Sequence, residues 1–328
     1  MTHGYWRLAG LVVCFLAGIA ALWLNGTRTK DMPLRIGTNP WPGYEFFHLA
    51  EKKGFFKEEG VDVELVRFSS LEDTLHAFQR RQVDGMTSTL IELLLAYEAG
   101  EPAKIVLMID FSNGTDVVIA RKGIDGVSGL RGKKIAVESA SLGVFIIARA
   151  LEKNGLSLSD ADIIGMNPAN MEKALLSGEV DALHAYPPVS TNILKHKDKV
   201  AQIFDSSQIP QEVMDVLSFS PEVVEHKMED MRAIRRAWGK TLVWAQEHPE
   251  EANRIMANVE GVSPEDFADA LKGVRMLSLS GQRHFMEKTG ICSKNILHVA
   301  TILHKEGHLR EPSPNPDLFL ADMEESSP

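Results

Sequence analysis

The sequence predicts an α/β protein with two similar lobes, and two observations carry that prediction. From Leu34 onward, short apolar runs alternate with amphipathic stretches of about ten to fifteen residues, which is typical of βαβ units. After residue 121 the same alternation begins again. Because strands joined by helices run parallel with right-handed crossovers, we expect each lobe to hold a mostly parallel sheet flanked by helices.

Composition sets outer limits on function. The chain has 328 residues, of which 44% are hydrophobic and 24% charged, so it can bury the cores of two compact units. Its formal net charge is −10 and no long basic block offsets it, which argues against nucleic acid as a partner. Only Cys14 and Cys292 are present, and Cys14 lies in an apolar N-terminal stretch. Neither an intrachain disulfide nor a cysteine metal cluster is therefore expected.

Residues 1–30 are predicted to be an export segment. Arg7 precedes an uncharged apolar run of seventeen residues, from Leu8 to Leu24. A positive charge followed by such a run predicts either a cleaved signal peptide or a retained membrane anchor. No small-x-small cleavage site follows Leu24, and Cys14 is poorly placed for lipid attachment. Both interpretations remain open.

The first lobe is expected to begin with residues 31–119. Its predicted strands are residues 34–38, 61–68 and 83–88, followed by the apolar run 104–121, and its predicted helices are 44–60 and 70–81. The second lobe is expected at residues 120–212. Its predicted strands lie in 130–139, 161–167 and 179–188, and its predicted helices are 142–154 and 168–177.

One short repeat supports two lobes of the same kind. Residues 77–86 match residues 174–183 in an apolar helical start and in a Val-Asp pair, where a helix ends and a buried strand begins. From about residue 229 the pattern is helical without strands, with Pro249 opening one helix and Ser263 capping another. Residues 213–328 are expected to return to the first lobe and end in a tail.

Enzyme signatures are missing from the sequence. There is no nucleophile elbow, phosphate-binding glycine loop, dinucleotide fingerprint or paired-histidine helix. Asp110 and Asp116 flank a Ser-Asn-Gly segment and are more typical of turn formation than of a catalytic pair. We therefore expect no catalytic residue, no metal site and no cofactor.

Polar and aromatic side chains instead follow the carboxyl ends of several strands, where parallel sheets bind ligands. The segment "NPWPGYE" (39–45) comes directly after the first strand: Pro and Gly make its backbone rigid, while Trp and Tyr offer flat apolar faces. Helix capping by the hydroxyl groups and core capping by the aromatic rings are the structural alternatives. The candidate ligand-binding residues are Asn39, Trp41, Tyr44, Ser88, Asp110, Asn113, Ser139, Ser141 and Tyr186.

The charge of the ligand stays open at this level. Ser139 and Ser141 precede a helix and could form an anion site with its free N–H groups. Acidic residues near the same loops, without an obvious arginine, favour an amine, a zwitterion or a heteroaromatic compound; they are Glu92, Asp110, Asp116 and Glu138. On balance the sequence favours a small organic ligand with an anionic or zwitterionic head over bare nitrate.

Residues 34–310 resemble the solute-binding proteins of ABC importers for nitrate, sulfonates and taurine, which are similar also to thiamine-pyrimidine precursor proteins. The resemblance runs through "GTNPWPGYEFFHLAEKKGFFKEEGVDVELV", "VDGMTSTLIELLLAYEAGEPAKIV", "DFSNGTDVVIARKGI", "LRGKKIAVESASLGVFIIARALEKNGL" and "LLSGEVDALHAYPP". It implies a type II periplasmic-binding-protein-like fold, with two crossing strands and the ligand between the lobes. It also implies closure on binding, delivery to an importer's permease and ATPase, and a periplasmic or extracytoplasmic location.

The resemblance also implies roles for the candidate residues. Trp41 and Tyr44 would lie on the first-lobe wall, Ser88 after the Val-Asp pair, and Asp110 with Asn113 near the crossover. Ser139 and Ser141 would lie at the start of a second-lobe helix, with Tyr186 opposite.

Two other functions stay open beside the importer role. A sensory module tethered to the inner membrane by residues 8–24 is one. A pyrimidine-precursor-type enzyme is the other, although the cysteine-rich motif of those enzymes is missing, so the chain is not expected to be an enzyme.

Overall fold

The computed structural model describes residues 32–139, 142–287 and 290–323. The predicted export segment, residues 1–30, lies outside the described residues. Leu34–Pro328 forms one compact unit. Within the described ranges, no helix combines the length and the apolar character needed to cross a bilayer.

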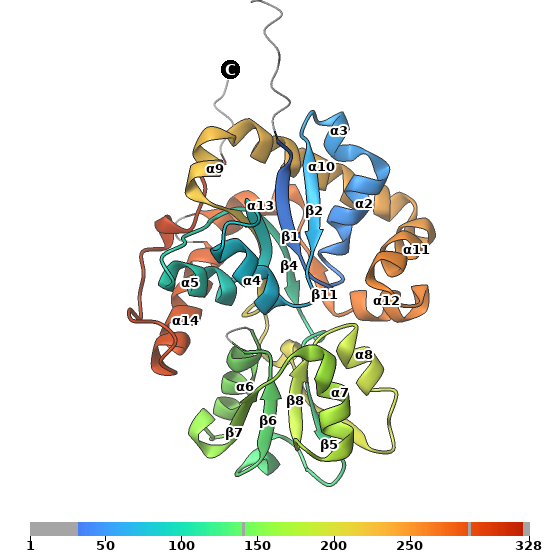
Figure 1. Ribbon diagram of the computed structural model, residues 1–328, viewed down its shortest axis with the longest axis vertical. Helices are drawn as coiled ribbons and strands as arrows, with labels where there is room; N and C mark the ends of the chain where they lie inside the picture. Colours follow the sequence, from blue (N-terminus) through green and yellow to red (C-terminus); the bar gives the residue numbers. More distant parts are fainter. Residues whose placement is uncertain (1–31, 140–141, 288–289, 324–328) are drawn as a thin grey trace, which may run out of the picture. The chain divides into compact units, whose positions relative to one another are not determined.

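The described chain contains two β-sheets, one in each lobe (Figure 1). The first has six strands in the order β11-β4-β10-β3-β1-β2 and the second has five in the order β7-β6-β8-β5-β9. The first sheet consists of β1 (Leu34–Thr38), β2 (Val63–Arg67), β3 (Gly85–Thr89), β4 (Lys104–Ser112), β10 (Met214–Phe219) and β11 (Val274–Met276). The second consists of β5 (Val117–Arg121), β6 (Lys134–Val137), β7 (Asp162–Gly165), β8 (Ala182–Ala185) and β9 (Val200–Asp205).

The predicted two-lobe α/β architecture is confirmed, but the sheets are mixed rather than mostly parallel. β1 runs parallel to β2 and β3, and β6 runs parallel to β7 and β8. β10 runs antiparallel to both β3 and β4, and β5 runs antiparallel to both β8 and β9. The chain crosses between the sheets from β4 to β5 and from β9 to β10. β5 and β10, the strands that enter each sheet at these crossings, therefore break the parallel pattern.

The Val-Asp repeat performs the same task in each sheet. The Asp84 carboxylate accepts a 2.8 Å hydrogen bond from the backbone N–H of Arg35, at the start of β1. Asp181 accepts a 3.1 Å bond from the backbone N–H of Lys134, at the start of β6. Each aspartate thus fixes the strand next to one edge of its sheet, β1 or β6, beside the strand that it precedes, β3 or β8. The division into residues 31–119, 120–212 and 213–328 stays a prediction.

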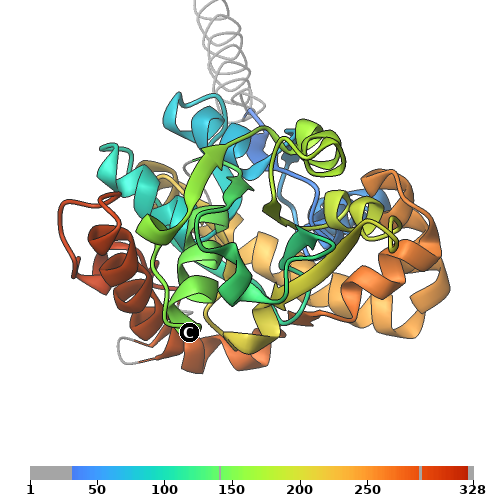
Figure 2. The same ribbon diagram turned by 90° about the horizontal axis from the view of Figure 1, so that it is seen from below.

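Helices cover the faces of the first sheet. α10 contacts α2 and α3 on one side, while α14 contacts α5 on the other. Figure 2 shows α11 and α12, in orange, and α14, in red, on opposite sides of the first lobe. The helices of this lobe are α2 (Glu45–Lys53), α3 (Phe55–Glu58), α4 (Leu71–Gln79), α5 (Leu90–Glu98), α9 (Pro221–His226), α10 (Met228–Glu247), α11 (Pro249–Glu260), α12 (Pro264–Leu271), α13 (Leu279–Met286) and α14 (Ile291–Lys305).

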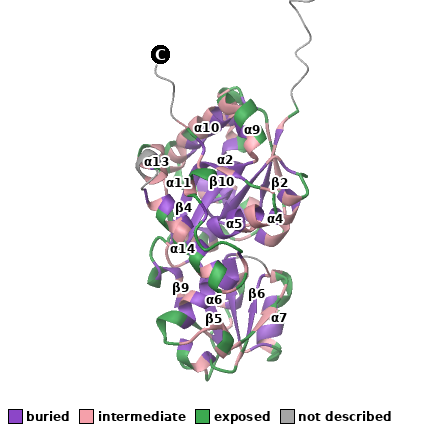
Figure 3. Cartoon of the chain, turned by 90° about the vertical axis from the view of Figure 1, so that its left-hand side faces the viewer, coloured by how far each residue is buried: buried purple, intermediate pink, exposed green. Residues whose placement is uncertain are grey.

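Three helices belong to the second sheet: α6 (Leu142–Lys153), α7 (Pro168–Ser177) and α8 (Val189–Ile193). In both lobes the inner strands are largely buried, whereas the edge strands β2 and β7 are partly exposed, and the helices turn exposed residues outward (Figure 3). Trp238 of α10 illustrates the packing, because its ring lies 4.9 Å from that of Phe47 and its N–H donates to Leu277 O. Large aromatic side chains of this kind dominate the energetics of a core.

The helical C-terminal region follows the prediction with one exception. Pro249 opens α11, and the Ser263 hydroxyl caps α12 by accepting from the backbone N–H of Asp266 at 3.0 Å. The expectation that this region contains no strand is wrong, because Val274–Met276 forms β11 on the edge of the first sheet. Three residues are too few to produce a recognisable strand pattern.

Candidate functional site

The proline-rich turn after β1 places two aromatic rings between the lobes. Backbone hydrogen bonds from Tyr44 and Glu45 to Trp41 O close the turn, and the two rings are 4% and 1% exposed. Gly43 is required at its position because a Cβ there would lie 1.9 Å from Asp110 Oδ2. The turn can therefore press against β4, which carries Asp110.

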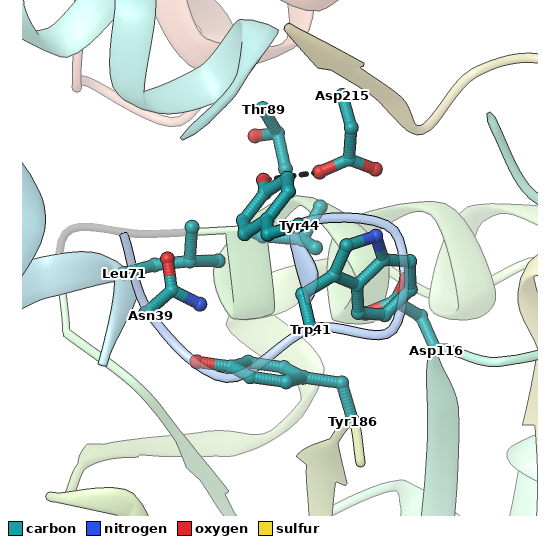
Figure 4. A pocket seen from close by; sticks show the side chains of 9 residues that line it. Asn39, Trp41, Tyr44, Leu71, Thr89, Asp116, Tyr186 and Asp215 are labelled. Carbon is teal, nitrogen blue, oxygen red and sulfur yellow. Dashed lines mark hydrogen bonds between the residues drawn. The ribbon is translucent and has the colours of Figure 1, made fainter. Parts of the chain in front are cut away.

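A closed pocket lies where the lobes meet, with residues of both lobes in its wall (Figure 4). Its volume is about 10 Å³, enough for one water molecule. Three aromatic rings surround it: Trp41 lies 6.4 Å from Tyr44 and 6.2 Å from Tyr186 between ring centroids. The wall consists of Asn39, Trp41, Tyr44, Leu71, Thr89, Asp116, Leu142, Tyr186 and Asp215.

Each of these rings donates its polar hydrogen to a buried carboxylate. Trp41 Nε1 donates to Asp110 Oδ2 at 3.2 Å. The Tyr44 hydroxyl donates to Asp215 Oδ1, and the Tyr186 hydroxyl to Glu138 Oε2 at 2.9 Å. The N–H and O–H donors of these three rings are thus already hydrogen-bonded to carboxylates of the protein.

Two of these acids are neighbours across the β4–β10 pairing. Asp110 lies opposite Asp215, and the two side chains are 0% and 2% exposed. Burial raises the pKa of Asp110 to about 7. Burial, followed by the negative charge of Asp110, raises the pKa of Asp215 well above its usual range. Near neutral pH the pair therefore retains a proton.

Asp116 is the acid that the second lobe contributes to the wall. Its Oδ1 lies 3.1 Å from Nε2 of the buried His184. Its Oδ2 has no hydrogen-bond partner among the described residues, and the same holds for Oδ1 of Asn39 across the pocket. Asp215 Oδ2, also in the wall, lacks a partner as well, so three buried oxygen atoms of the wall are unsatisfied among the described residues, which is uncommon for buried polar groups.

Two glutamates cap helices of the opposite lobe. Glu92 Oε1 accepts from the backbone N–H of Leu142 at the start of α6, at 2.9 Å. Glu138 Oε1 accepts from the backbone N–H of Glu72 in the first turn of α4, at 2.6 Å. Burial raises the pKa of Glu138 to about 7. These contacts join the lobes and place a carboxylate at each helix N-terminus, where a negative group is stabilised.

The structure brings several of the predicted residues together. Asn39, Trp41, Tyr44 and Tyr186 line the pocket, and Asp110 lies directly behind Trp41. Ser88 is buried within β3 and Asn113 donates its N–H to Gly273 O at 2.7 Å, and neither lines the pocket. Ser139 lies against Gly165 at the end of β7, and Ser141 lies outside the described residues. Whether these nine residues bind a ligand stays a prediction.

Sequence reasoning missed part of the wall. Leu71, Thr89 and Leu142 are at helix starts, and Leu71 and Leu142 are aliphatic residues that carry no chemical signal. Asp215 could have been noticed, because it is a single acid inside the apolar run "VMDVLSF" (213–219). A carboxylate in a buried strand is costly unless it has a partner, so its presence points to a specific role.

A larger and more open groove lies beside the closed pocket. It measures about 370 Å³, and its wall includes Thr115, Lys195 and Asp266. Lys195 Nζ contacts Asp266 Oδ2 at 3.1 Å, which links the segment after α8 to α12. No aromatic side chain lines this groove, so it lacks the flat faces found in the closed pocket.

Two mixed sheets joined by two crossings, with a pocket lined from both sides, define a two-lobe protein of the periplasmic-binding-protein class. The family model described as "NMT1/THI5 like" matches residues 41–252, more than half of the chain. The chain therefore belongs to the NMT1/THI5-like family.

The chain is similar to named relatives in sequence and to solved structures in fold. The taurine-binding periplasmic protein of Escherichia coli is 24% identical over 267 residues, covering 77% of this chain and 80% of the relative. The alkanesulfonate-binding protein of Xanthomonas axonopodis pv. citri shares the fold with a TM-score of 0.73 at 18% identity, covering 88% and 97% of the two chains. The desulfurization enzyme DSZB also shares the fold, with a TM-score of 0.63 at 15% identity, covering 88% and 97%.

Proposed function

We propose that this chain is an exported solute-binding protein that captures a small organic solute between its lobes and delivers it to the permease and ATPase of an ABC importer. The observation that carries the proposal is the pocket, whose aromatic and acidic wall is built from both lobes. A solute that touches both lobes favours the closed state and shifts the population toward it. The names of the taurine- and alkanesulfonate-binding relatives support a role in solute uptake.

Solute capture can be tested without knowing the solute. The protein is unfolded and refolded to remove bound molecules, incubated with a small-molecule extract of bacterial cells, desalted and then denatured. Mass spectrometry should find one compound enriched at about one molecule per chain. A Trp41→Ala variant that passes a folding check should lose this enrichment. A folded wild-type protein that enriches nothing contradicts the proposal.

Location and tethering are settled by a second measurement. We propose that residues 8–24 export the protein to a periplasmic or other extracytoplasmic location. The intact mass of the protein isolated from its own cells distinguishes a cleaved signal from a retained anchor. Retention beside a kinase gene would favour the sensory module, and a neighbouring permease and ATPase would favour import.

The enzymatic alternative is tested with the captured compound itself. The proposal expects that compound to be released unchanged after hours of incubation. Cys292 does not suit a nucleophile, because it is fully buried and burial raises the pKa of its thiol to about 12. A new product that disappears in the Asp110→Asn variant would establish the enzyme instead.

A further inference from the structure

The pocket wall offers acceptors and has few donors left. Trp41, Tyr44 and Tyr186 each donate to a carboxylate, as described above. The Thr89 hydroxyl donates to Glu92 Oε2, so it too is used within the protein. A ligand that needs donors, such as a sulfonate or nitrate, would have to break these bonds at a cost comparable to their formation.

The two helix N-termini at the lobe boundary are occupied in the same way. Such termini are natural anion sites, and in α4 and α6 they are filled by Glu138 and Glu92 of the opposite lobe. An anionic ligand would therefore compete with carboxylates that the chain itself supplies. This removes the main reason for expecting an anionic head from the sequence.

Charge adds to this argument. None of the nine wall residues is a lysine or arginine, whereas Asp116 and Asp215 are acidic and Asp110, Glu92 and Glu138 lie directly behind the wall. One basic group among the described residues contacts these acids directly: Nε2 of His184 lies 3.1 Å from Asp116 Oδ1. Although the Asp110–Asp215 pair retains one proton near neutral pH, it keeps one negative charge. An anion entering these surroundings would meet repulsion at low dielectric, while a cation would offset the charge.

Three buried oxygen atoms in the wall lack a partner among the described residues, and one of them, Asp215 Oδ2, belongs to the Asp110–Asp215 pair that retains a proton. Asp116 Oδ2 and Asn39 Oδ1 are buried, line the pocket from opposite lobes, and accept no hydrogen bond from the described residues. Unsatisfied acceptors inside a closed site call for a ligand with N–H donors. The three rings around them provide the faces that attract an organic cation.

From these observations, and resting on the proposed solute capture, we propose that the captured solute is a small organic cation. Its ammonium or amidinium N–H groups bind the free carboxylate oxygen of Asp116 and the amide oxygen of Asn39. Its apolar body packs between Trp41, Tyr44 and Tyr186. Entry requires the lobes or the side chains to move apart, because the closed pocket holds only about one water molecule.

The test compares probes that share a body and differ in their head group. Benzamidine, benzamide and benzenesulfonate form one set; butylamine, butanol and butanesulfonate form another, and taurine is added as a zwitterion. Isothermal titration calorimetry on the wild-type protein should show the cation of a set binding at least tenfold more tightly than its sulfonate. A sulfonate or taurine that binds more tightly than the cations overturns the inference and leaves solute capture intact.

If none of these probes binds, the charge of the compound captured from cell extract decides the inference. A captured cation supports the inference and a captured anion overturns it. If neither the panel nor the extract gives binding, the proposed function fails and the inference fails with it.

A matched pair of variants tests whether the carboxylate of Asp116 binds the positive charge of the ligand. Asp116→Asn should weaken the binding of the cationic probe at least tenfold and leave the affinity for the neutral probe unchanged. Asp198→Asn makes the same charge change at an exposed position and should alter neither probe. Equal loss of both probes in a folded Asp116→Asn protein would contradict a charge-specific role. The wild-type comparison of head groups keeps the test valid if Asp116→Asn does not fold.

Discussion

Asp84 in the first lobe and Asp181 in the second lobe occupy the same place in their sheets, yet the lobes differ in what they bring to the pocket. The first lobe contributes the rigid aromatic turn and the Asp110–Asp215 pair. The second lobe contributes Asp116 and Tyr186. The Val-Asp turn that stabilises each sheet is thus the same in both lobes, whereas the residues that line the pocket are divided between them. Neither half holds a complete site.

The lobes are also joined by an exchange. Glu92 of the first lobe caps α6 of the second, and Glu138 of the second lobe caps α4 of the first. Closure therefore buries two carboxylates and satisfies two backbone donors at once. Lobe closure and the ionisation of Glu138 are consequently linked, since burial raises the pKa of this carboxyl group.

The largest expected effect is that of pH on the ligand-free protein. Folded pKa values of about 7 for Asp110, Glu138 and Glu260, and about 8 for Glu45, lie above the unfolded values. The native state then holds more protons than the unfolded state, so stability falls as pH rises through these values. Between pH 6.5 and 8.5 the free energy of unfolding should decrease by about 4 kcal/mol.

The range from pH 6.5 to 8.5 lies above the range in which His48 changes stability in the opposite direction. Burial lowers the pKa of His48 to about 4, which makes stability rise with pH between about 4 and 6.5. Urea unfolding at four pH values measures the decrease. Glu260→Gln should remove only the contribution of Glu260 itself, which lies away from the pocket, and a free energy of unfolding that rises from pH 6.5 to 8.5 would show that the four acids are ionised in the folded protein.

Two glycines allow the next comparison. Gly43→Ala places a methyl group against Asp110 Oδ2, whereas a methyl group at Gly143 would meet Val137 and His184 at 3.0 and 3.1 Å. Overpacking of this kind costs about 1–3 kcal/mol. We expect Gly43→Ala to lie at the upper end of that range and Gly143→Ala at the lower end, in urea unfolding. The opposite order would mean that the first-lobe turn is the more adaptable wall.

A substitution of Glu138 removes one of the two carboxylate contacts that join the lobes. Glu138→Ala leaves the Tyr186 hydroxyl and the backbone N–H of Glu72 without their acceptor. A loss of about 2 kcal/mol is expected from unsatisfied buried donors. Small-angle scattering should also show a larger radius of gyration, because a contact between the lobes is gone. Glu138→Gln keeps an acceptor oxygen and serves as the control with little change in either measurement.

The sequence identifies the scaffold better than the site. The Val-Asp turns and the segment "NPWPGYE" are local, so proline, glycine and aspartate reveal them directly. Asp215 and Tyr44 are 171 positions apart, and their contact depends on β10 entering the first sheet from the second lobe. The capping of α6 by Glu92 depends on lobe closure, which no local pattern encodes. The sequence therefore shows the serine residues before α6 but not the carboxylate of Glu92 that accepts from the helix N-terminus.

The smallest expected effect returns to the shared aspartates. Asp84 and Asp181 both accept a backbone N–H, but Asp84 also binds the Arg35 side chain at 3.0 Å, with the two side chains 26% and 36% exposed. Loss of the backbone hydrogen bond should cost about 1 kcal/mol in each Asp→Ala variant. The half-exposed ion pair should add no more than about 0.5 kcal/mol for Asp84→Ala. Urea unfolding at low and high salt separates the two contributions, because only the ion pair is screened. Equal costs at low salt would mean that the two lobes use this turn identically and that the Arg35 contact contributes nothing.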